Sequence, residues 1–426
     1  MIEATQNMTA TILRMSVTQV VLGLSCVLSL AQSSSREAPS TAFDTDRLEK
    51  MHAMVKQYID EGKHAGAVTL VARNGKIADV ATFGYRDLEA KTPMTPDTIF
   101  RIYSMSKNIT SVAALMLLEE ARFTLDDPVT DYIPELRNLK IVNVGEQGDF
   151  VRPKRLITIR HLLTHTAGFT YDFSAPDQLK THWAKADIWN ENVDFKEFIR
   201  RISFVPLAHQ PGERHTYGVN TDVLGYLVQV VSGKPLEQFM QERIFGPLKM
   251  VDTGFDVPPE KMNRLAKLYE NGPDKALRPV AKPPYGTYAE VGKGFASGGG
   301  GLFSTANDYF RFGQMLLNGG TLDGKRILSR KTVELMTMNQ LVFLERPALD
   351  PRGADGFGFG GSVRLDVAKG GVLGSVGQFG WSGAATTTFI MDPKEQMIAI
   401  FMAQHLPFNQ HGIFAKFSTL VYASLE

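Results

Sequence analysis

The chain has 426 residues, 43% of them hydrophobic and 21% charged, an ordinary composition for a globular protein with a large core. Its 46 basic and 45 acidic residues leave a formal net charge of +1, so the charge balance gives no reason to expect a nucleic-acid partner. The sequence contains one cysteine, Cys26, which excludes an internal disulfide framework.

Residues 1–31 have the pattern of a cleavable secretory signal. Arg14 precedes the charge-free run SVTQVVLGLSCVLSL at 16–30, and small residues stand at the two positions that a signal peptidase reads before a cut near Ala31. We therefore expect export to the periplasm or the medium and removal of Cys26. The run is too short and too polar for a membrane span, and nothing later in the sequence is long and apolar enough to predict one. The polar residues 32–46 predict a linker.

The next segments predict a helix, a hairpin and a second helix. An amphipathic pattern begins at Asp46 and ends at Gly62. Two apolar runs then flank Asn74-Gly75, the strongest short signal for a β-hairpin. Residues 100–120, FRIYSMSKNITSVAALMLLEE, change to helical spacing, which predicts a buried helix that starts near Ser104.

The rest of the chain predicts a helical region followed by a return to strands. Residues 121–290 hold several helical stretches, at 159–165, 194–203, 221–232 and 235–244. After a glycine-rich turn come a capped helix, three strand patterns and a closing helix, at 304–319, 356–365, 380–392, 396–404 and 412–424. We expect an α/β fold with an antiparallel sheet flanked by helices, built from residues 47–120 and 291–426, and an inserted, mainly helical domain at 121–290.

The first element of chemistry is the run Ser104-Met105-Ser106-Lys107. Residues i and i+3 of a helix lie on one face, so Ser104 and Lys107 are expected to point the same way. A serine hydroxyl needs a base to become a nucleophile, and a neighbouring lysine can serve. Unpaired amides at the helix start suit an oxyanion beside Ser104. The alternative interpretation is that Ser104 caps the helix and Lys107 is exposed. That interpretation does not explain why the hydrophobic run FRIYS leads into Ser104.

The second element is Tyr217, on a loop between the turn at Pro211-Gly212 and a helix that begins near Asp222. A tyrosine hydroxyl beside a lysine can carry a proton. The alternative is a core tyrosine with a satisfied hydroxyl. A rival Tyr-x-Asn match, Tyr269-Glu270-Asn271, lies in a polar stretch that predicts a surface turn.

The third element is Trp381-Ser382-Gly383-Ala384, at the entry to an expected strand. Gly383 permits a close backbone approach to a ligand, and the amide of Ala384 could complete an oxyanion hole. The alternative is a strand with a buried tryptophan.

These three elements, in this order, resemble serine β-lactamases and penicillin-binding proteins. The stretches ITIRHLLTHTAGF, PGERHTYG and SGGGGLFSTANDYFRFGQMLLNGG are similar to the class C branch, which includes the family VIII carboxylesterases. The resemblance covers residue 47 to the C-terminus and implies a β-lactamase/transpeptidase-like fold. It also implies Ser104 as nucleophile, Lys107 and Tyr217 as a shared acid–base pair, and the Ser104 and Ala384 amides as the oxyanion hole.

Two departures from the class C pattern bear on the substrate. Val219 stands where the Asn of Tyr-x-Asn is expected, with Asn220 one position later, and Trp381-Ser382-Gly383 replaces Lys-Thr-Gly. The loss of the cation favours uncharged apolar groups over a β-lactam carboxylate. The literal alternative for this motif, Lys369-Gly370-Gly371, has a poorer strand pattern around it. The expected substrate-binding residues are Trp381, Ser382, Gly383 and Val219.

Three functions follow from this resemblance. The first is a carboxylesterase for short-chain acyl esters, with weak β-lactam hydrolysis at most. The second is a β-lactamase or D-Ala-D-Ala carboxypeptidase, and the third is a penicillin-binding sensor that acylates without turnover.

Other site classes have little support in the sequence. No G-x-S-x-G occurs, which argues against an α/β-hydrolase elbow. His161 and His165 have a metal-like spacing but no Glu follows His161, so capping is the better interpretation. The sequence implies no metal or cofactor, and it carries no signal for an oligomeric state.

Overall fold

The computed structural model describes residues 43–142, 150–284 and 293–426. The expected signal peptide at 1–31 lies outside the described residues, as does most of the expected linker. The last residues of that linker belong to the folded region, because Phe43 pairs with Leu425 and helix α1 begins at Thr45, where the Asp44 side chain accepts the amide hydrogen of Arg47.

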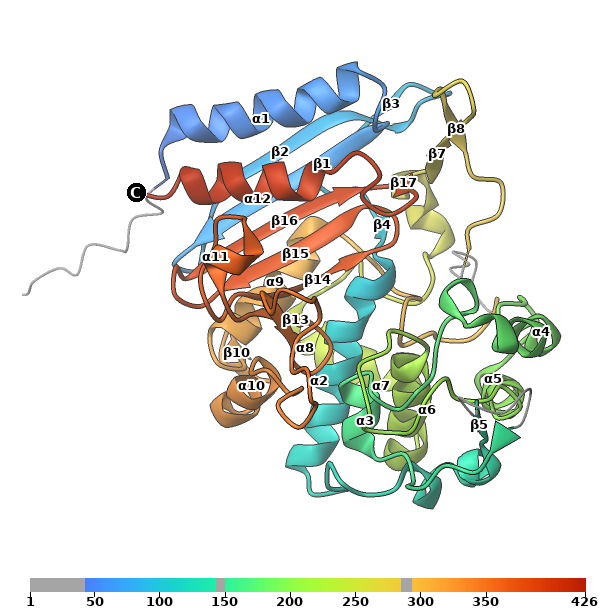
Figure 1. Ribbon diagram of the computed structural model, residues 1–426. Coiled ribbons are helices and arrows are strands. Elements are labelled where there is room, and N and C mark those ends of the chain that lie inside the picture. The colour runs from blue at the N-terminus through green and yellow to red at the C-terminus, as the bar shows by residue number, and fades with distance from the viewer. Residues whose placement is uncertain (1–42, 143–149, 285–292) are drawn as a thin grey trace, which may run out of the picture. The chain divides into compact units, whose positions relative to one another are not determined.

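An eight-stranded sheet forms the centre of this region (Figure 1), and all of its strand pairs are antiparallel. The hairpin predicted around Asn74-Gly75 joins β1 and β2. In order across the sheet, the strands are β12 (Asp355–Phe357), β13 (Ser362–Arg364), β14 (Phe379–Gly383), β15 (Thr387–Asp392), β16 (Met397–Ala403), β1 (Gly66–Arg73), β2 (Lys76–Asp87) and β3 (Thr92–Pro93).

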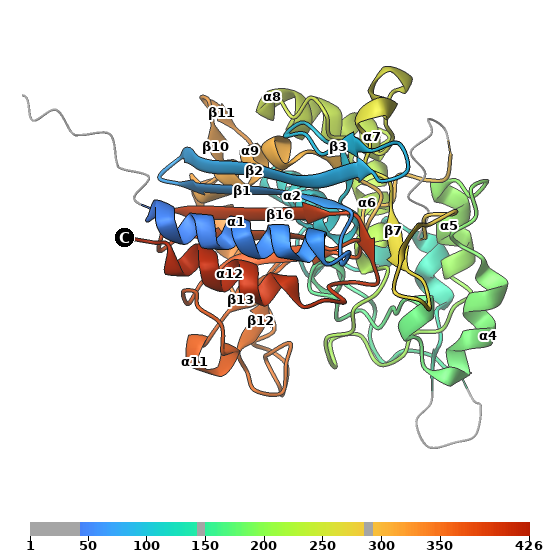
Figure 2. The ribbon, with the colours of Figure 1, turned by 90° about the horizontal axis from the view of Figure 1, so that it is seen from above.

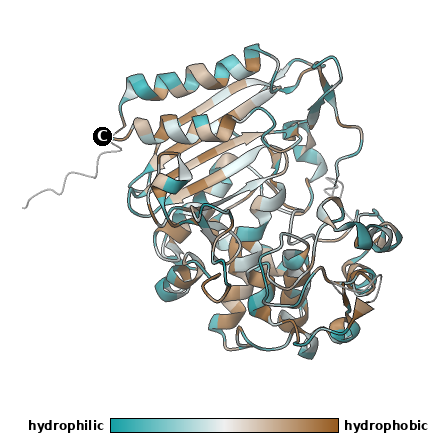
Figure 3. Cartoon of the chain, in the orientation of Figure 1, coloured by the Kyte–Doolittle hydropathy of each residue, from teal (hydrophilic) through white to brown (hydrophobic). Residues whose placement is uncertain are grey.

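Helices cover both faces of the sheet, which explains why β1 and β16 are buried on both sides. On one face α1 (Thr45–Asp60) and α12 (Ile413–Ala423) lie side by side (Figure 2). On the other face lie α2 (Ser106–Glu119) and α9 (Ala306–Leu317). Side chains alternate along a strand, so Ala67 and Val71 join the α1–α12 core while Val68 and Leu70 join the larger core with α2. Figure 3 shows hydrophobic residues along the strands and hydrophilic ones over much of α1.

The region between α2 and strand β9 (Phe303–Ser304) is mainly helical, as expected. The predicted helices at 159–165, 194–203, 221–232 and 235–244 are all present. The helices are α3 (Ile159–Leu163), α4 (Asp177–Ala186), α5 (Phe195–Ile202), α6 (Asn220–Ser232), α7 (Leu236–Met240) with a π-helical continuation (Gln241–Phe245), and α8 (Gly246–Leu248). Short 3₁₀ helices span Val129–Asp131, Pro134–Asn138, Asp172–Ser174 and Pro259–Arg264.

The smaller strand pairs and the remaining helices lie between these elements. They are β4 (Phe100–Arg101) with β9 (Phe303–Ser304), β5 (Ile141–Val142) with β6 (Phe150–Val151), β10 (Thr321–Leu322) with β11 (Lys325–Arg326), β7 (Tyr269–Asn271) with β8 (Leu277–Pro279) and β17 (His405–Leu406), α10 (Arg330–Met336) and α11 (Val367–Gly370).

Three local predictions are wrong. The single strand expected at 356–365 is a hairpin of β12 and β13, in which Phe357 pairs with Ser362. Tyr269–Asn271 is not a surface turn but strand β7, and the Tyr269 ring is fully buried with its hydroxyl donating to Glu89. The single strand expected at 380–392 is a hairpin of β14 and β15, because the chain turns at residues 384–386 with Thr386 at a φ of 62°. Among the described residues, no helix has the length and apolar character that a membrane span needs.

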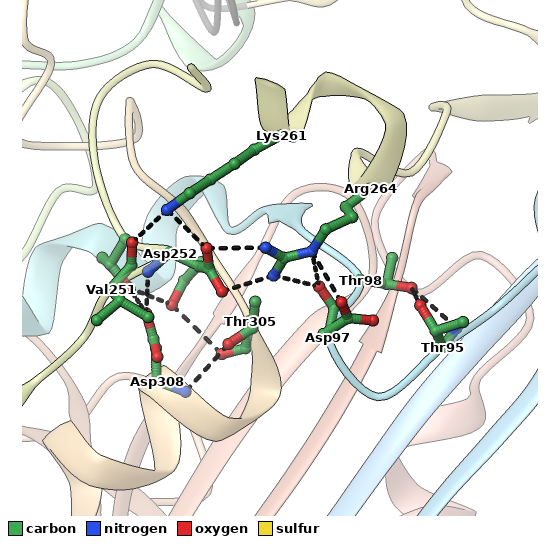
Figure 4. A network of polar contacts seen from close by, with 11 residues as sticks. Thr95, Asp97, Thr98, Val251, Asp252, Lys261, Arg264, Thr305 and Asp308 are labelled. Atoms are coloured by element: carbon green, nitrogen blue, oxygen red, sulfur yellow. Dashed lines mark hydrogen bonds and ion pairs between the residues drawn. The ribbon is translucent and has the colours of Figure 1, made fainter. Parts of the chain in front are cut away.

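An ion-pair network connects the segment before β4 to the helical region (Figure 4). The Arg264 guanidinium lies between Asp97 at 2.9 Å and Asp252 at 2.5 Å, and Lys261 adds a second cation 2.9 Å from Asp252. Asp252 in turn donates its amide to the Asp308 carboxylate at the start of α9. Strand β4 leads directly to Ser104, so this network fixes the approach of the chain to the candidate site.

Candidate active site

Ser104 lies in a single 3₁₀ turn, Tyr103–Met105, which runs directly into the buried helix α2. The Ser104 side chain is partly exposed, whereas Tyr103 and Met105 on either side are buried. Tyr103 has a φ of 42°, a left-handed conformation that residues other than glycine rarely adopt and that costs about 1–3 kcal/mol. Packing of Tyr103 against Leu268 and Ala385 holds this strained residue in place and presents Ser104 to the surface.

Lys107 lies within hydrogen-bond reach of Ser104, as the i, i+3 spacing predicts. Its Nζ is 3.2 Å from the Ser104 Oγ, 3.0 Å from the Tyr171 hydroxyl and 2.6 Å from the Gly299 carbonyl oxygen. The side chain is fully buried. An ammonium group can donate to all three oxygens. A neutral amine can donate to Tyr171 and Gly299 and keep its lone pair for the Ser104 hydroxyl, so the same geometry suits a proton acceptor.

A buried carboxylate, Asp222 in the first turn of α6, also shapes the site. Its Oδ1 accepts the Ser297 hydroxyl at 2.5 Å and the Gly299 amide at 3.1 Å, so it fixes the loop whose carbonyl binds Lys107. Burial raises the pKa of the Asp222 carboxyl, and the Lys107 cation and these hydrogen bonds oppose that effect. Gly299 has no space for a side chain, since a Cβ there would lie 2.4 Å from the Asp222 Oδ2.

Tyr217 closes the other side of the lysine. The Lys107 Nζ lies 4.6 Å from the centre of the Tyr217 ring, a cation–π distance. The Tyr217 hydroxyl oxygen accepts the indole N–H of Trp381 at 3.2 Å. The structure therefore brings together Ser104, Lys107, Tyr217 and Trp381, which were selected from the sequence.

His165 supports the loop that carries Tyr217. Its ring stacks on the Tyr217 ring at 5.0 Å and 19°, and its Nδ1 faces the Gly218 amide and the Asn220 side chain. Its Nε2 bonds with the Thr221 hydroxyl. Complete burial, with Lys107 as a second cause, lowers the pKa of His165 well below its usual value, so the ring is neutral and accepts at Nδ1.

The expected strand motif lies at the end of β14 rather than at its start. A Cβ on Gly383 would lie 2.2 Å from the Ile102 carbonyl oxygen, so the close approach at this glycine is made by the protein's own backbone just before Ser104. This corrects the expectation that Gly383 approaches a ligand. The contact places the following residue, Ala384, beside Ser104 at the edge of a common cavity.

The cavity has a volume of about 880 Å³. Around Ser104 its wall is strongly aromatic. We call this part the aromatic lobe and define it by Tyr103, Tyr171, Phe173, Trp189, Tyr217 and Trp381. Ser382 and Ala384 also line the cavity.

The substrate-binding role expected for Val219 needs correction. Its side chain is 0% exposed, packs in the main core and does not line the cavity. Asn220, the next candidate for the asparagine of Tyr-x-Asn, is equally buried and bonded to His165. The peptide after Tyr217 turns into α6 there, which directs both side chains inward.

Three residues of the site had not been selected from the sequence: Tyr171, Asp222 and Gly299. No sequence motif marks Tyr171 or Asp222 as a site residue. Asp222 stands in the first turn of a helix, where an acidic residue is common. Gly299 belongs to the glycine-rich turn that the sequence shows, but only the structure reveals that its amide binds the Asp222 carboxylate.

His161 is a capping residue, as the sequence favoured. Its Nδ1 accepts the Thr158 amide in a reciprocal capping box at the start of α3. In the part of the chain that the structure describes, no group of three or more His, Cys, Asp and Glu side chains has a metal-binding arrangement.

Comparisons with known proteins show the family to which the chain belongs. The Beta-lactamase family model matches residues 51–423. The chain is 37% identical over 379 residues to Protein Rv1367c of Mycobacterium tuberculosis, with 84% of this chain and 90% of that protein covered. It is 33% identical over 298 residues to Esterase EstB of Burkholderia gladioli, with 64% and 71% covered.

Among solved structures, EstCE1, a hydrolase with promiscuous acyltransferase activity, superposes with a TM-score of 0.76 at 26% identity, with 89% of this chain and 98% of that chain covered. The chain therefore belongs to the β-lactamase family and has the β-lactamase/transpeptidase-like fold. Within that family it is a serine hydrolase of the kind that includes the family VIII esterases.

Proposed function

We propose that this protein is a carboxylesterase that hydrolyses short-chain acyl esters through an acyl-enzyme on Ser104. The observation that carries the proposal is the 3.2 Å contact between the Ser104 Oγ and the buried Lys107 Nζ at the wall of an aromatic cavity. A nucleophile in contact with a base, and a base oriented by further groups, is the arrangement that covalent catalysis requires.

In the acylation step the Ser104 Oγ attacks the ester carbonyl carbon while its proton passes to the Lys107 amine. The amine is oriented by its bonds to Tyr171 and Gly299. Negative charge develops on the carbonyl oxygen, and the backbone amides of Ser104 and Ala384 are the proposed donors to it. The C–O bond to the alcohol then breaks.

The departing alkoxide needs a proton, for which Tyr217 is the proposed donor. The proton that Lys107 accepts is then proposed to return to the phenol oxygen, and the Trp381 indole N–H stabilises negative charge there. In deacylation, water attacks the acyl carbon, gives its proton to the same pair and releases the acid and the free Ser104 hydroxyl.

The residues that line the cavity support an ester over a β-lactam. A β-lactam carries a carboxylate, which needs a nearby cation. Among the described lining residues the one cationic side chain is Arg364, and its guanidinium Nε already pairs with Asp355 at 2.7 Å. At the strand position where class C enzymes have lysine, Trp381 faces Tyr217 instead.

The test compares kcat/KM for p-nitrophenyl butyrate and nitrocefin with wild-type protein and Ser104→Ala. We expect the ester to be preferred by several orders of magnitude and Ser104→Ala to lose turnover with an unchanged melting temperature. Mass spectrometry of the quenched wild-type reaction should locate the butyryl group on the peptide that contains Ser104. Preference for nitrocefin would reassign the protein as a β-lactamase, and activity in Ser104→Ala would overturn the mechanism.

A further inference from the structure

His165 binds the Tyr217 loop on both sides of the tyrosine. Its carbonyl oxygen accepts the amide hydrogen of Thr216 at 2.8 Å, and its side-chain Nδ1 accepts that of Gly218 at 3.3 Å. Between these two bonds, the Tyr217 ring stacks on the imidazole with 5.0 Å between the ring centres. One residue therefore holds the tyrosine through both of its neighbours and through its own ring.

The imidazole of His165 is itself held in one orientation. Because Nδ1 accepts a backbone amide, Nε2 carries the hydrogen and donates it to the Thr221 hydroxyl at 3.0 Å. The Phe357 ring packs edge-on against the imidazole at 5.5 Å, and the side chain of His165 is fully buried. Thr221 belongs to α6, which lies against α3 (Figure 1), so the imidazole connects the loop to packed helices.

The backbone of His165 adopts a strained conformation. Its φ is 54°, in the left-handed region that residues other than glycine rarely adopt. From here the chain runs along the Tyr217 loop, where the Thr166 carbonyl accepts the Gly212 amide at 2.8 Å and the Thr170 carbonyl accepts the Val219 amide at 3.2 Å. Strain of this kind persists only where the surrounding structure imposes it, and it is concentrated at functional sites.

The contacts of His165 require the particular chemistry of a neutral imidazole. The ring supplies a flat face for Tyr217, an acceptor for the Gly218 amide and a donor for the Thr221 hydroxyl. Phenylalanine would keep only the ring face. Asparagine would keep an acceptor and a donor without the ring, and it adopts a left-handed φ more readily than most residues. These two substitutions therefore remove different parts of the same support.

We propose that His165 is a positioning residue for Tyr217 in the reaction at Ser104. This inference rests on the proposed function, in which the Tyr217 hydroxyl protonates the departing alkoxide. The Trp381 indole binds the hydroxyl end of the tyrosine at 3.2 Å, whereas His165 holds its ring face and the backbone on either side. A hydroxyl without this support would occupy the reactive position for less of the time, so proton transfer would be slower.

A double-mutant cycle distinguishes this role from a general effect on folding. His165→Phe and His165→Asn are each made in the wild-type chain and in Tyr217→Phe, which lacks the hydroxyl. If His165 acts by placing that hydroxyl, its loss has little effect once the hydroxyl is absent. His161→Asn is the matched control, because His161 is a nearby buried histidine that also accepts a backbone amide but caps α3.

With p-nitrophenyl butyrate, we expect each His165 variant to lower kcat/KM by about tenfold in the wild-type chain and by less than about twofold in Tyr217→Phe. His161→Asn should lower the melting temperature and change kcat/KM by the same factor in both chains. Equal fold losses in both chains, full activity of the His165 variants, or failure of both to fold would overturn the positioning role. Ester turnover that survives in Ser104→Ala would instead overturn the esterase mechanism, so the two failures are distinguishable.

Discussion

The indole N–H of Trp381 donates to the phenol oxygen of Tyr217 over 3.2 Å, although the two residues are 164 positions apart in the chain. Trp381 is thus a partner of the proposed acid–base group as well as a wall of the cavity. The exchange of a strand lysine for tryptophan removes a cation and adds a neutral hydrogen-bond donor to the site.

Replacement of Trp381 by phenylalanine should separate these two roles. Trp381→Phe keeps an aromatic wall but removes the donor to Tyr217, so we expect kcat/KM for p-nitrophenyl butyrate to fall about tenfold. Full activity of Trp381→Phe would mean that the indole acts as a wall alone. Circular dichroism of the variant provides the control for folding.

Lys107 and the two tyrosines beside its amine should differ in importance for catalysis. Lys107→Ala and Tyr217→Phe each remove a proposed proton carrier and should lower kcat by a factor on the order of a hundred or more. Tyr171→Phe removes one orienting bond, and we expect a loss of about tenfold. The kinetics of the three variants, each with its melting temperature, test this ranking. A larger loss in Tyr171→Phe than in Tyr217→Phe would reverse the assignment of the second proton carrier.

Asp222 should act as a positioning residue for Lys107. Asp222→Ala removes the acceptor for Ser297 and Gly299, so the Gly299 carbonyl loses its fixed place beside Lys107. We expect kcat to fall on the order of a hundredfold in this variant and about tenfold in Asp222→Asn, which retains an acceptor oxygen. The pH profile of kcat/KM should also move in Asp222→Asn, because a nearby negative charge is lost. An unchanged profile with only a lower melting temperature would indicate a structural role.

Phe173 should contribute to acyl-chain preference. It lines the aromatic lobe, stacks on Tyr171 at 5.2 Å and is 64% exposed. Phe173→Ala should lower the ratio of kcat/KM for p-nitrophenyl hexanoate to that for the acetate by roughly fourfold, which corresponds to the loss of one buried CH₂ at about 0.8 kcal/mol. Phe204→Ala, at a position that is 68% exposed and outside the cavity, is the matched control. The same change in both variants would argue against an acyl site.

A group of three histidines should make the fold sensitive to acid. The His64 ring lies 5.0 Å from that of His405 and 5.6 Å from that of His411. Burial, followed by the neighbouring histidines, lowers the pKa of His64 to about 3, and burial lowers that of His405 to about 4. Unfolded histidine titrates near pH 6.5, so between these values the unfolded chain binds more protons and the free energy of unfolding decreases as the pH falls.

His64→Phe removes one of these groups and keeps an aromatic ring beside Tyr58 and Phe401. From pH 7 to pH 4 the wild-type protein should lose about 3 kcal/mol more of its unfolding free energy than the variant does. Urea unfolding at several pH values measures this difference. Parallel pH curves for the two proteins would contradict the role of His64.

The sequence by itself determined the order of most elements and the closeness of Ser104 and Lys107. Ser104 and Lys107 could be paired because three residues along a helical turn share a face, a rule that needs no tertiary structure. The hairpin at Asn74-Gly75 and the periodic helices followed for the same reason, since their signals are contained in a few neighbouring residues.

The tertiary structure decided everything that depends on which distant faces meet. No local pattern predicts that Tyr171 and Gly299 bind the Lys107 amine, because they are 64 and 192 residues away from it in the chain. The bond from the Gly299 amide to Asp222 likewise spans 77 residues. The sequence pattern predicts Val219 as a substrate contact, but the turn into α6 directs its side chain into the core. Side-chain direction at such a turn is set by the packing of the whole core, which a one-dimensional pattern does not contain.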